Sequence, residues 1–97
     1  MTEVTFYQNA ESQCVGFDVK GHAGYAQEGE DIVCAAISAL VINTVNSMEA
    51  FTKDHFDLQV DENSADIHLF VEGTPSKECR LLLNSLILGL QLSLIHI

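Results

Sequence analysis

Four short segments of the chain alternate between apolar and polar residues, which is typical of half-buried β-strands. These segments are residues 4–7, 14–20, 56–60 and 67–71. In the second segment Val15, Phe17 and Val19 share one face, so Cys14 is expected on the opposite face. Polar residues join the first segment to the second and the third to the fourth, and they predict two hairpins.

Two further segments repeat apolar residues at the spacing of an α-helix. The first runs from Asp31, its expected N-cap, to about Phe51. Its predicted apolar positions are Ile32, Val33, Ala36, Ile37, Leu40, Val41, Val45 and Met48. The second helix is expected to begin at Thr74 and Pro75, because threonine caps helices and proline is favoured in the first turn. Its predicted apolar positions include Leu81, Leu82, Ser85, Leu86, Leu88 and Gly89.

The predicted order of elements is strand, strand, helix, strand, strand, helix. Four strands with one apolar face and two helices with apolar stripes bury these surfaces most simply in two layers. We therefore expect an α+β two-layer sandwich with a four-stranded, mainly antiparallel sheet, in a single domain over residues 1–97. Residues 90–97 carry no charge and show no clear polar face, so they are interpreted either as a dimer contact or as residues foreign to the natural chain, the latter for 92–97 above all.

The chain is strongly acidic, with 14 Asp and Glu against 4 Lys and Arg and a formal net charge of -10. Its cations are scattered along the sequence, so direct binding of nucleic acid is not expected, whereas basic proteins would be attracted at long range. Three cysteines without paired spacing, and an amino terminus unlike a signal peptide, predict a cytoplasmic protein with reduced thiols. No apolar run predicts a membrane span, and no ligand pattern predicts a metal or another cofactor.

His22 and Cys34 stand at the two ends of a glycine-rich segment, between the second predicted strand and the first predicted helix. Counted from an N-cap at Asp31, Cys34 is the third helical residue, where free N–H groups and the helix dipole favour a thiolate. A histidine that takes the thiol proton would complete a nucleophile–base dyad. The alternative is that Cys34 is a small buried residue and His22 a solvated loop residue. Cys14 and Cys79 have no histidine close in sequence and are expected to be structural.

Four further residues are candidates for supporting or lining such a site. Asp31 is either a plain helix cap or a cap that also orients the histidine. Ser38 follows the cysteine by one helical turn on the same face, so it either lines the site or packs near the sheet. Tyr25 either packs on a substrate or anchors its own loop, and Gly21 allows unusual backbone angles directly before the histidine.

The sequence GHAGYAQEGEDIVCAAISAL, residues 21–40, resembles the signature of the ribosomal-processing cysteine protease family Prp, found in Firmicutes. The similarity extends over nearly the whole chain, and only residues 92–97 depart from it clearly. It implies a small cytoplasmic, homodimeric endopeptidase. The implied substrate is the precursor of the large-subunit ribosomal protein numbered twenty-seven, whose N-terminal extension is removed by cleavage after an aromatic pair.

The resemblance also implies roles for residues of this chain. His22 corresponds to the catalytic histidine and Cys34 to the nucleophile, while residues 21–33 correspond to a loop that covers the site. Asp31 and Ser38 correspond to supporting positions. Two other functions stay open from the residues alone. One is a non-catalytic acidic module or ribosome-assembly factor for a basic ribosomal protein, and the other is a thiol sensor, for which no resolving cysteine is evident.

Overall fold

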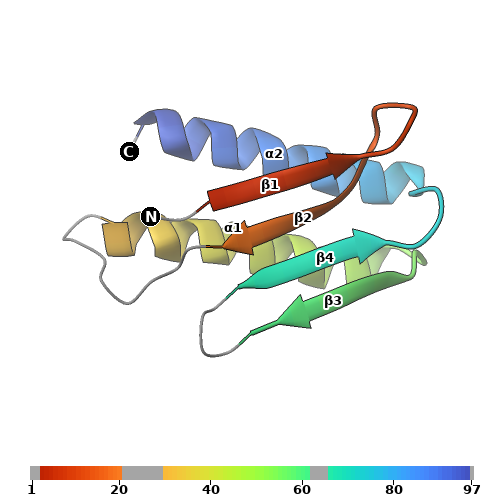
Figure 1. Ribbon diagram of the computed structural model, residues 1–97, viewed down its shortest axis with the longest axis horizontal. Helices are drawn as coiled ribbons and strands as arrows, with labels where there is room; N and C mark the ends of the chain where they lie inside the picture. The colour runs from red at the N-terminus through yellow and green to blue at the C-terminus, as the bar shows by residue number, and fades with distance from the viewer. Residues whose placement is uncertain (1–2, 21–29, 62–65, 97) are drawn as a thin grey trace.

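The computed structural model describes residues 3–20, 30–61 and 66–96, and for residues 30–34 and 92–96 it describes the backbone alone. Its elements in chain order are β1 (Glu3–Gln8), β2 (Cys14–Lys20), α1 (Glu30–Phe51), β3 (Phe56–Val60), β4 (Ile67–Val71) and α2 (Lys77–His96). The strands form one sheet in the order β1-β2-β4-β3, and all three neighbouring pairs are antiparallel. Both helices lie on one face of this sheet (Figure 1), so the predicted two-layer α+β fold is confirmed.

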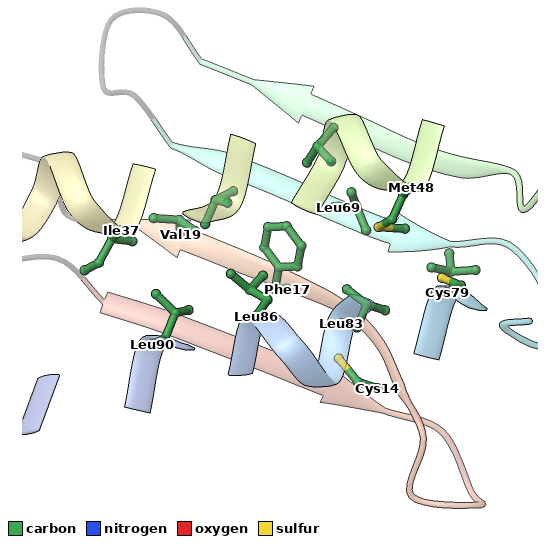
Figure 2. Packing of buried hydrophobic residues seen from close by; sticks show 13 residues of the cluster. Cys14, Phe17, Val19, Ile37, Met48, Leu69, Cys79, Leu83, Leu86 and Leu90 are labelled. Atoms are coloured by element: carbon green, nitrogen blue, oxygen red, sulfur yellow. The ribbon is translucent and has the colours of Figure 1, made fainter. Parts of the chain in front are cut away.

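The hydrophobic core lies between the two helices and the two central strands (Figure 2). Phe17 of β2 and Leu69 of β4 are fully buried there, because each strand turns alternate side chains toward the helices. The helices contribute Ile37, Val41, Val45, Met48, Cys79, Leu83, Leu86 and Leu90. By contrast β3 is an edge strand, and its Leu58 and Val60 stay exposed.

A β-bulge near the start of β2 changes which way its first residue faces. Tyr7 is opposite Gly16 and Gln8 is opposite Cys14, so Val15 is the extra residue on β2. Because the bulge interrupts the alternation, Cys14 joins Phe17 in the core and is only 4% exposed. The prediction that Cys14 faces away from Phe17 was therefore wrong.

Helix α1 buries the predicted stripe but starts earlier than predicted. Ile37, Val41 and Met48 are buried at helical spacing. The helix begins at Glu30, so Asp31 is its second residue rather than its N-cap. Glutamate is a better helix former than aspartate, and a carboxylate in the first turn is stabilised by the helix dipole, which explains the additional residue.

Helix α2 begins at Lys77, so the prediction of Thr74 as its cap and Pro75 as its first-turn residue was wrong. Ser76 is the N-cap, because its Oγ accepts a hydrogen bond from the Cys79 N–H at 3.1 Å. The N–H of Ser76 in turn donates to Oδ2 of Asp54 at 2.7 Å. This contact ties the start of α2 to the connection between α1 and β3, and it reaches across 22 positions of sequence.

The buried face of α2 also differs from the prediction. Cys79, Leu83, Leu86 and Leu90 are buried, and of these only Leu86 was among the predicted positions. Leu81 and Leu88 are instead 69% and 58% exposed. Apolar residues occur all around this helix, so their spacing did not select the inward face. In the described part of the chain, neither helix is long and apolar enough to cross a bilayer.

Candidate active site

The described backbone brings the two elements that flank the glycine-rich segment together at one end of the molecule. Strand β2 ends at Lys20 and α1 starts at Glu30, and both ends lie on the same side in Figure 1. Three predicted site residues, Gly21, His22 and Tyr25, lie outside the described residues. The topology therefore places the segment that carries the histidine between β2 and the helix that carries the cysteine.

Cys34 is the fifth residue of α1, not the third as predicted. The free N–H groups of a helix belong to its first turn, and the effect of the helix dipole declines beyond that turn. A thiolate at the start of the second turn gains less from the helix than the sequence indicated. Activation of a thiol at this position would therefore depend more on a nearby base.

Ser38 lies where the sequence placed it, one helical turn after Cys34 on α1. The two positions share a face of the helix because they are four residues apart. Ser38 is half-buried beside Ile37, which is only 1% exposed. Ser38 is thus at the border between the core and the helix surface that carries Cys34.

The other two cysteines belong to the core (Figure 2). Cys14 is 4% exposed and Cys79 is fully buried, and both are free thiols. Burial raises the pKa of Cys14, and burial together with the charges of Asp54 and Cys14 raises the pKa of Cys79 to about 11. A thiol that stays protonated at neutral pH is a poor nucleophile. Their predicted structural role is confirmed, which leaves Cys34 as the candidate nucleophile.

A polar cluster on the opposite face of the sheet was missed by the sequence analysis. Asp18 is only 8% exposed, and its carboxylate accepts a hydrogen bond from the Tyr7 hydroxyl and pairs with Nδ1 of His68. Because an ionised carboxylate only accepts, that nitrogen carries a proton. Asp18 and His68 are direct neighbours in the pairing of β2 with β4, across fifty positions of sequence. No local pattern reveals this pairing.

The contacts of Asp18 explain its electrostatics. Burial alone would raise the pKa of Asp18, but the hydrogen bonds from Tyr7 and His68 outweigh it and hold the pKa below its ordinary value. The hydrogen bond to Asp18 also raises the pKa of Tyr7, since a Tyr7 phenolate would face the Asp18 carboxylate. Phe17, the neighbour of Asp18 on β2, points to the helices, so this cluster lies on the far side of the sheet from α1 and Cys34. It stabilises the sheet and does not belong to the predicted dyad.

Metal binding finds no support in the described residues. Within residues 3–20, 30–61 and 66–96, no three His, Cys, Asp or Glu residues come together in a way that could hold an ion.

Comparison with known proteins identifies the family. The family model for cysteine protease Prp matches residues 1–93. The chain belongs to the Prp family. It is also 31% identical over 91 residues to the ribosomal processing cysteine protease Prp of Staphylococcus aureus strain Mu50, covering 94% of this chain and 86% of the relative. The protein is therefore a cysteine protease, as the signature in residues 21–40 indicated, and the interpretation as a non-catalytic binding module is set aside.

Solved Prp structures have the same fold. The S. aureus Prp structure in complex with a substrate peptide superposes with a TM-score of 0.93 at 27% identity, covering 99% of this chain and 91% of that chain. A second S. aureus Prp structure, in complex with a covalently linked product peptide, gives a TM-score of 0.84 at 30% identity, covering 95% of this chain and 87% of that chain. The two structures thus contain S. aureus Prp with a substrate peptide and with a covalently linked product peptide.

Proposed function

We propose that this protease acts through Cys34 as nucleophile and His22 as general base, and that it removes the N-terminal extension of the large-subunit ribosomal protein numbered twenty-seven. The observation that carries this proposal is the placement of the three cysteines. Cys14 and Cys79 are buried in the core with raised pKa values, while Cys34 is at the start of α1, beside the segment that contains His22. The covalently linked product peptide of the S. aureus relative supports a covalent step.

The proposed reaction has two halves. First, His22 takes the proton of Cys34, and Sγ attacks the carbonyl carbon of the scissile peptide bond. His22 then gives this proton to the leaving amine, which departs and leaves a thioester on Sγ. In the second half His22 takes a proton from water, the hydroxide attacks the thioester, and the thiolate leaves and regains its proton. The N–H groups of the first turn of α1 are candidates for stabilising the oxyanion.

Four neighbouring residues are proposed to support this chemistry. Asp31, in the first turn of α1, orients the imidazole or the loop that carries it. Ser38, one turn after the nucleophile, lines the substrate cleft. Tyr25 packs on the bound peptide, and Gly21 gives the chain its freedom between the end of β2 and the histidine. No cofactor or metal takes part in the proposed mechanism.

The charge of the chain supports a basic substrate. Ribosomal proteins are basic because they bind RNA, and a partner with a net charge of -10 attracts them at long range. We expect the association rate to fall as salt is added, because salt screens this attraction. The aromatic pair before the cleavage site would occupy the apolar part of the cleft between the loop and α1. This function places the enzyme in the cytoplasm, where ribosomes are assembled.

A homodimer is proposed as the working form. Exposed apolar residues support it, because Leu58 and Val60 of the edge strand β3 surround a cavity of about 180 Å³ together with Ile42 of α1. Edge strands that expose apolar side chains are common sites of association. A second copy paired along β3 would cover these side chains, and sedimentation of the purified protein would show the dimer.

The test of the dyad is cleavage of a peptide that copies the ribosomal extension, followed by mass spectrometry. Wild type is expected to cut once, after the aromatic pair. Cys34→Ala and His22→Ala are expected to lose about 10³-fold or more in rate, and Cys34→Ala is expected to bind the peptide still. Cys14→Ala serves as the thiol control and should keep the wild-type rate per folded molecule. Near-wild-type cleavage by Cys34→Ala or His22→Ala would overturn the assignment of the dyad.

A further inference from the structure

A groove lies between the β1–β2 turn and the first half of α2, and we refer to it as the α2 groove. Its volume is about 570 Å³, which is in the range of small-molecule sites. Gln13, Cys14, Lys77, Arg80, Leu81 and Asn84 form most of its lining, and Ser12 and Glu78 complete it. The groove therefore combines cations and amides with an apolar side.

The α2 groove is remote from the candidate active site. Cys14, in the groove, is the first residue of β2, whereas the segment with His22 follows Lys20 at the other end of the same strand. Six strand residues span roughly 20 Å. In Figure 1 the start of α2 and the start of α1 likewise lie at opposite ends of the molecule. A ligand in this groove would not occupy the site proposed for the protease.

The charge of the groove differs from that of the chain as a whole. The protein has 4 Lys and Arg in total and a net charge of -10, yet two of these cations, Lys77 and Arg80, line one groove. A single carboxylate, that of Glu78, accompanies them. In a strongly acidic protein, two cations at one groove mark the place where an anion is attracted rather than repelled.

One donor of the Arg80 side chain is left without a partner. Its Nε is buried and has no hydrogen-bond acceptor, and within the described residues its side chain forms no ion pair. A guanidinium stays charged at every physiological pH and has five N–H donors, and leaving a buried donor without an acceptor costs free energy. An oxyanion matches this group because carboxylate and phosphate oxygens accept two parallel N–H bonds from it.

We propose that the α2 groove binds a small molecule through its carboxylate or phosphate group. Arg80 and Lys77 supply the positive charge, the amides of Gln13 and Asn84 supply further hydrogen bonds, and Leu81 contacts the apolar body of the ligand. A polynucleotide is a poorer ligand, since the remaining surface of a chain with a net charge of -10 repels its other phosphates. The site is independent of the dyad and does not rest on the protease assignment.

The test is a titration of the isotope-labelled full chain at constant ionic strength, followed by the NMR shifts of its backbone amides. Inorganic phosphate, phenyl phosphate and benzoate are the probes. Whichever of phenyl phosphate and benzoate binds more tightly identifies phosphate or carboxylate as the preferred anion. Saturable shifts are expected at Gln13, Lys77 and Arg80, with phenyl phosphate binding more tightly than inorganic phosphate if the apolar side takes part. Arg80→Gln should weaken binding by about tenfold or more, and Arg80→Lys by less, because lysine keeps the charge but loses the paired donors.

Lys53→Gln is the matched control, because it removes the same charge outside the groove and should leave the affinity unchanged. If Arg80→Gln does not fold, Lys77→Gln, on the exposed surface of α2, takes its place. The proposal is overturned if no probe saturates, if the charge-removing groove variant binds as tightly as wild type, or if the shifts appear equally in every part of the protein. Tighter binding of a short RNA than of all three probes would also overturn it.

Discussion

Two glycine-to-alanine substitutions are expected to change the stability of this protein in opposite directions. Gly16 is in β2, where a Cβ would lie 2.4 Å from the carbonyl oxygen of Leu69 and 3.1 Å from Cα of Phe70. Both are backbone atoms of β4, so no side chain can rotate away. To make room for the methyl group, β4 must move away from β2 by more than half an ångström, which strains the pairing of the two central strands.

Gly89 is the matched control because it occurs in the helix α2. There a Cβ would meet only Cδ1 and Cδ2 of Leu40, at 3.6 and 3.7 Å, which is ordinary contact. Gly16→Ala should reduce the free energy of unfolding by about 3 kcal/mol or more, because overpacking against backbone also strains hydrogen bonds. Gly89→Ala should increase the free energy of unfolding by about 0.5–1 kcal/mol. Alanine favours the helix and reduces the number of conformations open to the unfolded chain.

Urea denaturation followed by far-ultraviolet circular dichroism measures both changes, with unchanged m values as the check that each transition stays two-state. A small domain has a total stability of about 5–15 kcal/mol, so the loss at Gly16 is a large share of it. If the free energy of unfolding of Gly16→Ala lies within about 0.5 kcal/mol of the wild-type value, then β2 and β4 do not approach each other as closely as described. A loss of stability in Gly89→Ala would show that the packing of α2 against Leu40 is tighter than described.

Two further predictions concern Asp18 and Ser76. The folded state holds the pKa of Asp18 below its ordinary value, so the stabilisation from Tyr7 and His68 is complete above about pH 5 and is lost as the pH falls through about 4 and below. Asp18→Asn should be less stable than wild type at pH 7 and should lose less stability than wild type between pH 5 and 3. Urea titrations that show the same loss in both proteins over this pH range would contradict the prediction. Ser76→Ala should reduce the free energy of unfolding by about 1 kcal/mol, because it removes the acceptor for the Cys79 N–H but keeps the backbone contact to Asp54. An unchanged urea midpoint would argue against Ser76 as the N-cap.

The sequence by itself determined the elements whose patterns are complete within a few residues. Strands β2, β3 and β4 occupy the predicted segments, and α1 buries the predicted stripe of Ile37, Val41 and Met48. Alternation and helical spacing are local properties, so a short window of sequence is enough to predict such elements. The family was also evident from sequence, because its signature is a contiguous run over residues 21–40.

Only the tertiary structure decided the features that depend on distant partners. Apolar residues occur on every side of α2, so the neighbouring sheet and α1 selected Leu83 and Leu90 as inward residues. Its start at Lys77 was decided by Ser76 and Asp54, which meet only in the folded chain. The bulge that turns Cys14 into the core, the pairing of Asp18 with His68 and the α2 groove arise in the same way. Apart from the bulge, which lies within one hairpin, the deciding contacts join residues that are distant in sequence, and the free energy of those contacts overrides local preference.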